Sequence, residues 1–525
     1  MSENSQMPLR RVCWVVLSGL IVLAYSNTMR APFVYDDKIE VIGNTTIRFI
    51  DQWQSIVLYN PSRWLLQLSY AANYHQGQLD PFIYHFTNVA IHILAAGAAF
   101  AAVEQLARLA KHDAPTRLAA WVAAFWALHP MLTESVTYTT GRSESLCGLF
   151  AFSAIGLWAK HLRNQKWWSA GIVYVLTLAA IFTKEVGLVI PLVLVLMNAL
   201  LAPGQKWRTL IPLVALLVLG FLGRFLSVTN EYPSLGAALL DANLGDKLMP
   251  KEVDRSLSVQ LSTQAEVWLR YVLMWIAPVG QTIFHQVPER GPSELRGVLS
   301  IIGWIAFIGS SWILTRKRPL TRFAIFTACI TLLPSSSVVS LKESMAEHRA
   351  HQFGLFFVLA IFSTASPSWR WFVLLLPLCG LTHWRNQVWQ SEVSIWQEAT
   401  ERHPNSAKAW YGLGDAHRFS SQLESALGAY GKCLEVDSKD HDCWNNLGIT
   451  YAELGRGEQA INAWSSVLIY DPKYCKAHTN IGQIAFLQRQ FEKSRGSFES
   501  SISHCPDNII AHYGLGNLYY GPLRN

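Results

Sequence analysis

Long apolar stretches recur along the first three quarters of the chain, and they constrain its fold more than any other feature. Eleven of them approach the ~20 residues with which an α-helix spans a ~30 Å hydrocarbon layer. They lie at residues 12–30, 82–106, 117–132, 144–160, 168–183, 186–202, 208–228, 297–315, 320–334, 353–365 and 369–382. Only 15% of the 525 residues are charged, against roughly a quarter in soluble proteins. The sequence therefore predicts a polytopic, all-α membrane bundle of about eleven transmembrane helices.

The distribution of charge predicts the topology of this bundle. From His383 onward there are 13 Lys and Arg against 15 Asp and Glu, whereas residues 1–382 hold 30 against 21, a net charge of +9. This basic excess lies in short connectors between apolar stretches, as in cytoplasmic loops, so the basic balance does not indicate nucleic-acid binding. The stretch 264–280 is interrupted by Glu266 and Arg270 and is not expected to cross. We expect the N-terminus inside and the C-terminal region outside.

Polar groups gather on the predicted outer side. The loops 31–81, 229–296 and 335–352 are long, and the turns at 129–144 and 183–185 are dense in ionisable residues. Ionisable groups at a membrane boundary are costly, so their concentration on one face indicates a site.

A 34-residue repeat occupies the C-terminal part. Its period is marked by Trp410, Trp444, His478 and His512, which open the patterns WYGLGDA, WNNLGIT, HTNIGQI and HYGLGNL. The period and the small residues at fixed positions resemble the tetratricopeptide repeat, a helical hairpin that stacks into an α-solenoid and binds peptides in its groove. We expect domains at 1–384 and 385–525, the second with a half-repeat helix at 388–402, three full repeats and a capping helix at 509–520.

Four of the eight cysteines lie in these repeats. In repeat geometry Cys475 begins the first helix of an antiparallel pair and Cys505 ends the second, while Cys433 and Cys443 flank one turn between repeats. We predict disulfides 475–505 and 433–443, on the condition that the outer compartment is oxidising.

Short motifs in the outer loops carry a resemblance to a known family. FVYDD followed by Asn44, then ALHPMLTESVTYTTGRSE, FTKEVGLVIPLVLVL and AEHRAHQ, precede RNQVWQSEVSIWQEATERHPN and the repeats. Their order and the two-part architecture resemble the transmembrane and tetratricopeptide repeat-containing (TMTC) protein O-mannosyltransferases, within the C-type (GT-C) multi-spanning glycosyltransferases that use lipid-phosphate sugar donors.

The resemblance implies inverting transfer of a sugar, mannose as first choice, from a polyprenyl phosphate to Ser or Thr hydroxyls of a protein on the outer side. A hydroxyl needs a carboxylate within ~3 Å to take its proton as it attacks the anomeric carbon. We expect Asp36 to be that base and Asp37 to orient it or the acceptor. Sequence alone leaves an exchange of these roles open.

The departing phosphate gains negative charge, which calls for cations or hydrogen-bond donors. Arg349 is the leading candidate, although the family pattern has a basic residue where this chain has His348. The full set of expected substrate-binding residues is His129, Glu134, Arg142, Lys184, Glu185, Glu347, His348 and Arg349. His129 and Glu134 are expected to bind sugar hydroxyls or to brace the loop of Asp36. No metal is expected to be required, with a Mg²⁺ or Mn²⁺ bridge to the phosphate as the alternative.

Other readings stay open. A C-type transferase that acts on another sugar, on a glycan or lipid acceptor or on Asn shares these membrane motifs, and a membrane-anchored repeat adaptor without catalysis predicts that Asp36 is dispensable. The expected partners are the lipid-linked donor, an acceptor protein in the repeat groove and membrane lipids. Three full repeats favour a bacterial inner membrane with periplasmic repeats over the endoplasmic reticulum with lumenal ones.

Overall fold

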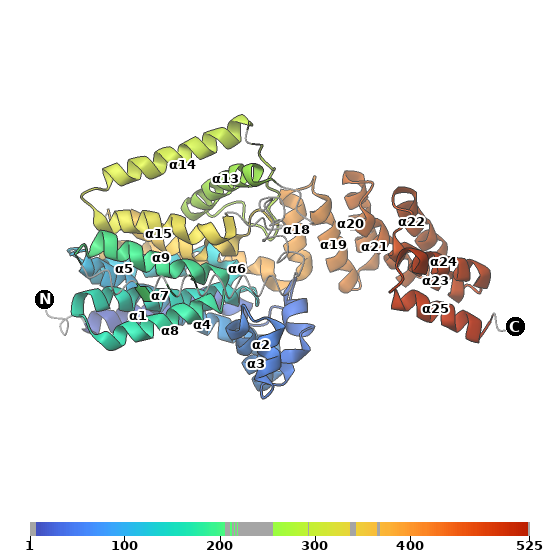
Figure 1. Ribbon diagram of the computed structural model, residues 1–525, viewed down its shortest axis with the longest axis horizontal. Helices are drawn as coiled ribbons and strands as arrows, with labels where there is room; N and C mark the ends of the chain where they lie inside the picture. Colours follow the sequence, from blue (N-terminus) through green and yellow to red (C-terminus); the bar gives the residue numbers. More distant parts are fainter. Residues whose placement is uncertain are drawn as a thin grey trace. The chain divides into compact units, whose positions relative to one another are not determined.

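The computed structural model describes residues 7–204, 211, 212, 215, 218, 256–291, 293–336, 343–364 and 368–522. Within these ranges every regular element is a helix (Figure 1), which confirms the predicted all-α class. The chain divides into two compact units, Met1–Ser391 and Glu392–Asn525. The division falls slightly after the boundary expected from sequence at residue 384.

The first unit is a bundle of long helices. Its main members are α1 (Met7–Tyr25), α4 (Pro81–Leu109), α5 (Pro115–Ala127), α7 (Arg142–Asn164), α8 (Trp167–Ile181), α9 (Ile190–Leu201), α13 (Leu257–Ile276), α14 (Leu295–Leu314), α15 (Pro319–Ser336), α16 (His351–Phe362) and α17 (Leu375–Arg385). Ten of the predicted crossings coincide with helical segments, and the eleventh, 208–228, lies almost wholly outside the described residues.

Four helical segments of the described chain are long and apolar enough to cross a membrane by length and composition. They are Arg10–Thr28, Pro81–Leu109, Arg142–Asn164 and Leu295–Leu314, and two shorter apolar helices span Trp168–Ile181 and Glu185–Leu201. These helices agree with a membrane protein, while the total of eleven crossings and their direction stay predictions.

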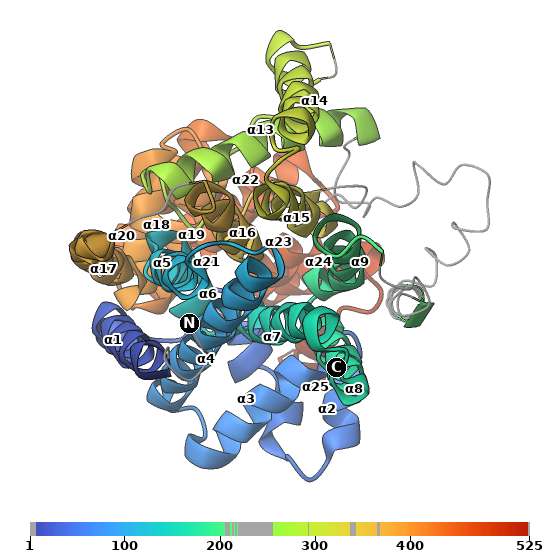
Figure 2. The same cartoon turned by 90° about the vertical axis from the view of Figure 1, so that its left-hand side faces the viewer.

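Small residues let α4 and α7 pack closely in the middle of the bundle, seen end-on in Figure 2. A Cβ added at Gly156 of α7 would lie 2.9 Å from the Cα of Ala102 on α4, which is backbone and cannot move aside. Trp158 of α7 is fully buried, as is Trp126 of α5, whose ring packs edge-on against Phe152 of α7. This close contact holds α7 against α4, and Arg142 at the start of α7 belongs to the predicted site.

Residues 31–81, the first of the loops predicted to lie on the outer side and called the first outer loop below, fold into a small helical layer of their own. It contains η3 (Lys38–Ile42), η4 (Thr45–Arg48), α2 (Trp53–Tyr59) and α3 (Trp64–Gly77). Val41, Ile47 and Ile56 pack with Tyr70 and Tyr84 as a separate apolar cluster. The loop is therefore an ordered platform, and it carries the aspartate pair at its start.

Between the long helices lie the short elements that hold most of the site. These are η5 (Pro130–Leu132), α6 (Thr133–Val136), η6 (Glu185–Val189), η8 (Glu347–Ala350) and, just after α17, η10 (Asn386–Gln390).

The second unit is a stack of antiparallel helix pairs. It comprises α18 (Glu392–Arg402), α19 (Ala407–Phe419), α20 (Leu423–Val436), α21 (His441–Glu453), α22 (Gly457–Tyr470), α23 (Cys475–Leu487), α24 (Phe491–His504) and α25 (Ile509–Tyr520). The helix expected at 388–402 begins only at Glu392, because η10 and the extended Ser391 precede it.

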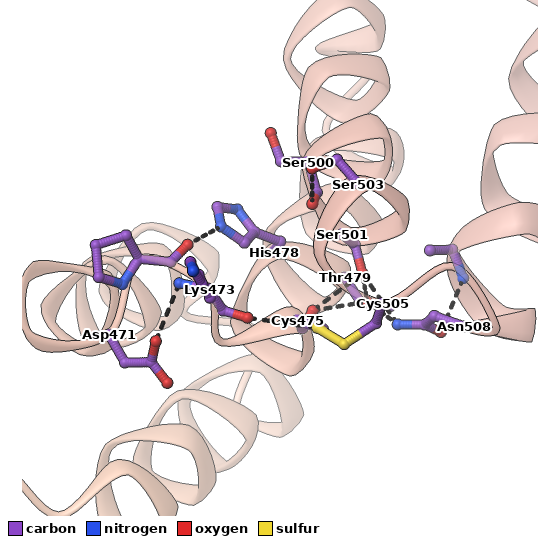
Figure 3. Close-up of a disulfide and its surroundings, with 12 residues drawn as sticks. Asp471, Lys473, Cys475, His478, Thr479, Ser500, Ser501, Ser503, Cys505 and Asn508 are labelled. Atoms are coloured by element: carbon purple, nitrogen blue, oxygen red, sulfur yellow. Dashed lines mark hydrogen bonds between the residues drawn. A yellow bond between two sulfur atoms is a disulfide. The ribbon is translucent and has the colours of Figure 1, made fainter.

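Both predicted disulfides are present in the repeats. Cys433 is joined to Cys443 and Cys475 to Cys505. Figure 3 shows the second bridge between the start of α23 and the residue that follows α24. Beside it Asn508 donates hydrogen bonds to Thr479 and Ser501, at 2.9 and 3.0 Å, so the bridge lies within a polar contact between helices.

Candidate functional site

The two aspartates on the first outer loop have different surroundings. Asp37 is fully buried, and its carboxylate accepts hydrogen bonds from the backbone amides of Val34 at 3.2 Å and Thr140 at 2.8 Å. Asp36 is exposed, and its own backbone amide donates to the Tyr138 hydroxyl at 2.8 Å. Asp37 thus secures the turn, whereas Asp36 is the carboxylate that can meet a substrate.

Both carboxyl groups have raised pKa values, for partly different reasons. Burial raises the pKa of Asp37 to about 7, against the lowering effect of the two amide donors. Asp36 is exposed as a residue, but neighbouring protein atoms displace part of the water around its carboxylate, and this is the first cause of its raised pKa. The negative charge of Glu343 is the second cause, while the Tyr138 hydroxyl lowers the pKa. A base with a raised pKa accepts a proton more readily, as long as it remains ionised at the working pH.

Tyr35, next to Asp36, links the aspartates to the predicted phosphate-binding arginine. Its hydroxyl donates to Glu343 Oε1 at 3.0 Å, and Arg349 Nη1 donates to the Glu343 carbonyl at 2.7 Å. Tyr35 also has a φ of 51°, a left-handed conformation that is strained for a bulky residue and that clusters at functional sites. Glu343, which the sequence analysis did not select, therefore joins two segments some 300 residues apart.

Glu134 and His348 form the closest contact among the predicted residues. Glu134 Oε2 accepts from the His348 amide at 2.9 Å, and its Oε1 lies 2.6 Å from His348 Nδ1. Burial raises the pKa of Glu134, and it lowers the pKa of His348 to about 3, with the charge of Lys184 adding to that lowering. The neutral pair with one shared proton is thus favoured, and within the described residues the Nε2 of His348 makes no hydrogen bond.

Lys184 and Glu185 are both paired with other protein groups. Lys184 Nζ lies 2.7 Å from the fully buried carboxylate of Glu144 and donates to Ser143 Oγ at 3.2 Å. Glu185 forms an ion pair with Arg63 of the first outer loop. Lys184 is therefore a buried cation near His348 whose charge is paired with Glu144. The ion pair of Glu185 connects η6 to the helical layer of the first outer loop.

The carboxylate of Glu347 is bound by a segment of the chain that sequence reasoning did not select. Its buried carboxylate accepts hydrogen bonds from Gln281 at 2.9 Å, the Thr282 amide at 2.6 Å and His285 at 3.1 Å. All three donors lie in the segment after α13, so Glu347 holds that segment against η8. Its predicted contact with substrate gains no support from this geometry.

Arg142 and His129 are also used for packing. The guanidinium of Arg142 is fully buried and donates to Asn88 Oδ1 at 2.6 Å, to the Ser69 carbonyl and hydroxyl, both at 3.1 Å, and to the Tyr84 carbonyl at 3.1 Å. His129 Nδ1 accepts from the Met131 amide, and its ring stacks on Trp275 with centroids 4.3 Å apart. Neither is brought to Asp36, and their predicted substrate contacts stay untested.

The structure thus gathers Asp36, Asp37, Glu134, Lys184, His348 and Arg349 around the start of the first outer loop. Sequence reasoning missed Tyr35, Glu343, Glu144 and Tyr138, which connect these residues. Tyr35 and Tyr138 lie within the quoted motifs, but tyrosines in such segments are ordinary packing residues, so nothing singled them out.

One group in the described part of the chain has the spacing of metal ligands, namely Cys433, Asp440 and Cys443. Its two cysteines are joined by a disulfide, so they offer no thiolate. The expectation that the reaction needs no metal stays a prediction.

Fold and site together define a class: a multi-helix membrane protein with an acidic pair on its first long loop and a C-terminal helical repeat array. Comparison with known proteins makes this more specific. Residues 407–440 match the tetratricopeptide repeat model. Protein O-mannosyl-transferase Tmtc1 of Drosophila melanogaster is 29% identical over 206 residues, 36% of this chain and 23% of its own length.

Two longer alignments cover most of the chain. A protein O-mannosyl-transferase of Caenorhabditis elegans is 22% identical over 468 residues, and TMTC3 of Mus musculus is 22% identical over 476 residues; each covers 81% of this chain. The chain spans 62% and 51% of these two relatives. The resemblance to the TMTC protein O-mannosyltransferases that the motifs indicated is thereby confirmed.

Among solved structures, ArnT from Cupriavidus metallidurans bound to undecaprenyl phosphate aligns over 90% of this chain and 81% of its own. The identity is 14% and the TM-score 0.39, a similarity too low to carry an argument about chemistry.

Proposed function

We propose that this chain is an inverting glycosyltransferase that moves a sugar, mannose as first choice, from a polyprenyl phosphate to Ser or Thr hydroxyls of proteins on the outer side of a membrane. The observation that carries the proposal is the exposed carboxylate of Asp36, tied through Tyr35 and Glu343 to Arg349. The activity named for the relatives supports the reaction class. The repeats support a protein acceptor, because stacked helical hairpins form a peptide-binding groove.

In the proposed step, Asp36 accepts the proton of the acceptor hydroxyl as its oxygen forms a bond to the anomeric carbon. The bond from that carbon to the phosphate oxygen breaks, and the electron pair leaves with the lipid phosphate. A single displacement of this kind inverts the anomeric carbon and needs one base. Asp37 holds the turn through its two amide bonds and takes no proton from the acceptor.

The lipid phosphate becomes more negative as it leaves, so preorganised donors on that side lower the barrier. Arg349 is suited to this role because among the described residues its guanidinium makes one hydrogen bond, to a backbone carbonyl, and an arginine has five N–H donors. The Nε2 of His348, which has no hydrogen bond among the described residues, supplies a second donor when the neutral ring carries its proton on that nitrogen. Lys184, which lies near His348, adds positive charge to the site, although its ion pair with Glu144 compensates much of that charge.

The two disulfides indicate the kind of compartment in which the repeats lie. Structural disulfides persist in the periplasm, the endoplasmic reticulum and outside cells, and are rare in the cytosol. They support an array on the outer side of the membrane. We keep the bacterial inner membrane with periplasmic repeats as the first choice and the endoplasmic reticulum as the second.

The deciding experiment incubates the full-length protein in detergent or nanodiscs with polyprenyl-phosphate mannose and a Ser/Thr-rich acceptor protein. We expect transfer by the wild type and a loss of about 10²- to 10⁴-fold in Asp36→Asn, the range for removal of a general base. Asp51→Asn is the matched control, because Asp51 is an exposed aspartate of the same outer loop. Its activity should equal that of the wild type.

Three outcomes would change the proposal. Absence of transfer by the wild type, with the acceptor still bound by the repeats, favours the membrane-anchored adaptor. Transfer to a glycan or lipid acceptor but not to protein favours another C-type transferase. Activity that a chelator abolishes and Mg²⁺ or Mn²⁺ restores would establish the metal-bridged alternative.

A further inference from the structure

The short segment 136–140, which runs from the last residue of α6 toward the start of α7, is the common support of the aspartate pair. The Tyr138 hydroxyl accepts the amide hydrogen of Asp36, and the Thr140 amide donates to Asp37 Oδ1, both at 2.8 Å. Asn88 of α4 donates to the carbonyls of this segment at 3.1 to 3.4 Å, which fixes its middle. The positions of both aspartates therefore depend on the position of this segment.

The opposite side of the segment is held by the connector η10 (Asn386–Gln390). Asn386 is fully buried, and its Oδ1 accepts from the Thr137 hydroxyl at 2.6 Å while its Nδ2 donates to the Ala24 carbonyl at 3.0 Å. A side-chain amide that spans two buried groups fixes their separation, since loss of either bond leaves a polar group without a partner. Asn386 thus clamps the segment to the end of α1.

A second contact from the connector reaches the tyrosine itself. Trp389 is 3% exposed, and its ring stacks on that of Tyr138 with centroids 5.6 Å apart and 23° between the planes. Stacked rings restrict the χ angles of both partners, so Trp389 limits where the Tyr138 hydroxyl can point. Trp389 is thus connected to the Asp36 backbone through two contacts, its stack on the Tyr138 ring and the hydrogen bond between the Tyr138 hydroxyl and the Asp36 amide.

The connector ends at Gln390, whose side chain donates to the Asn27 carbonyl at 2.6 Å, and the repeat unit begins at Glu392. The residues just before the repeats are thus built into the support of the aspartates. No part of the proposed chemistry requires a tryptophan at this place.

We propose that the connector is a positioning element of the transferase, in which Trp389 acts through Tyr138 to set the orientation of the Asp36 carboxylate. Trp389 and Tyr138 are positioning residues and touch no substrate. The inference rests on the proposed function, because it assigns these residues to the same base.

Removal of the tyrosine hydroxyl also changes the electrostatics of the base. The charged groups that act on Asp36 from the surrounding elements are Glu343 before η8, Glu40 on η3 and Glu134 on α6. All three raise the pKa of Asp36, whereas the Tyr138 hydroxyl lowers it. Loss or displacement of that hydroxyl therefore raises the pKa, and the acid limb of the activity profile moves to higher pH.

The test compares full-length Trp389→Ala, Tyr138→Phe and Trp389→Phe with the wild type. Trp384→Ala is the matched control, since Trp384 precedes the connector by only a few residues on α17 but is 66% exposed. In Trp389→Ala and Tyr138→Phe we expect kcat to fall about 10- to 100-fold, the range for a small misplacement of a reacting group, with the KM for the donor unchanged. The acid limb should shift upward in both, by about half a pH unit or more for Tyr138→Phe. Trp389→Phe should recover most of the rate.

Folding is followed separately, by elution as a single species and by retention of both disulfides after alkylation without reductant. A lower yield of folded protein with an unchanged pH profile and kcat per folded molecule means that the residues are structural only, and the inference is wrong. It is equally wrong if Trp389→Ala behaves as Trp384→Ala does. Absence of transfer by the wild type contradicts the proposed function instead, so the two failures are distinguishable.

Discussion

The repeat unit and the outer-loop site use their side chains in opposite ways. In the repeats the same contact recurs: a Cβ added at Gly414 would lie 2.5 Å from Tyr430, one at Gly448 2.4 Å from Trp464, and one at Gly482 2.7 Å from Phe498. In the site each contact occurs once, and several join distant segments, as when Tyr35 binds Glu343 across 308 positions.

The difference shows where each kind of information lies. A contact that repeats every 34 residues leaves a period in the sequence, and the period reveals the partner. A contact made once leaves only a polar residue in a loop, whose partner depends on the folded bundle. Stability is expected to be concentrated in the repeated contacts, and activity in the single ones.

After the loss expected for Asp36→Asn, the largest expected effect is also on activity, at Arg349. Arg349→Ala should lower kcat about 10²- to 10³-fold, the usual cost of one donor to a developing negative charge. Arg349→Lys should recover part of the rate, because it keeps the charge but not the planar fork. The measurement is steady-state sugar transfer at saturating donor.

Arg48→Ala is the matched control for this change. Arg48 is an exposed arginine of the first outer loop that, like Arg349, donates to a backbone carbonyl, that of Ile42 at 3.3 Å. Equal losses in both variants would mean that the charge of the outer face in general, rather than the place of Arg349, supports the reaction.

The same contrast explains which features of the fold and of the site can be predicted from the sequence. The helices and the repeats are predictable because apolar length and period are visible in a single chain. The two disulfides follow from repeat geometry, since the positions of Cys475 and Cys505 on one antiparallel pair are fixed by the period. The role of Arg142 is not predictable, because its acceptors come from Asn88, Ser69 and Tyr84, which no spacing relates to it.

A smaller effect is expected on the stability of the repeats. The bridge between Cys475 and Cys505 closes a loop of 30 residues. Its removal in the Cys475→Ser, Cys505→Ser double variant should destabilise the unit by about 3 to 4 kcal/mol, because the unfolded chain gains freedom. Hydrogen exchange of α23 and α24 in the full chain measures the loss.

The bridge between Cys433 and Cys443 provides the comparison, since it closes only 10 residues. Its removal should cost less, by roughly 1 kcal/mol on the same chain-entropy argument. If reductant leaves hydrogen exchange unchanged throughout the wild-type repeats, the thiols are not bonded in the purified protein and both expectations fail.

The repeated contact between a glycine and an aromatic ring predicts a further, smaller loss of stability. In Gly414→Ala the new methyl group meets the fully buried ring of Tyr430, which must shift. Such overpacking costs typically about 1 to 3 kcal/mol. Thermal unfolding of the full-length variant, read by exchange in α19 and α20, should show the destabilised pair, while sugar transfer at low temperature stays near the wild-type rate.

The smallest expected effect has the opposite sign and comes from a glycine outside the repeated contact. Gly428 lies in the middle of α20, is exposed and has no heavy atom within 4 Å of an added Cβ. Gly428→Ala should therefore stabilise the helix by about 0.5 to 1 kcal/mol, because alanine loses less backbone freedom on folding. The same exchange measurement in α20 gives the result. Gly414 and Gly428 lie on adjacent helices of one repeat. Changes in stability of opposite sign therefore identify the ring contact as the cause of the loss in Gly414→Ala. Equal losses of stability in both variants would mean that α20 tolerates no added side chain and that the repeated glycine contact does not hold the repeat together.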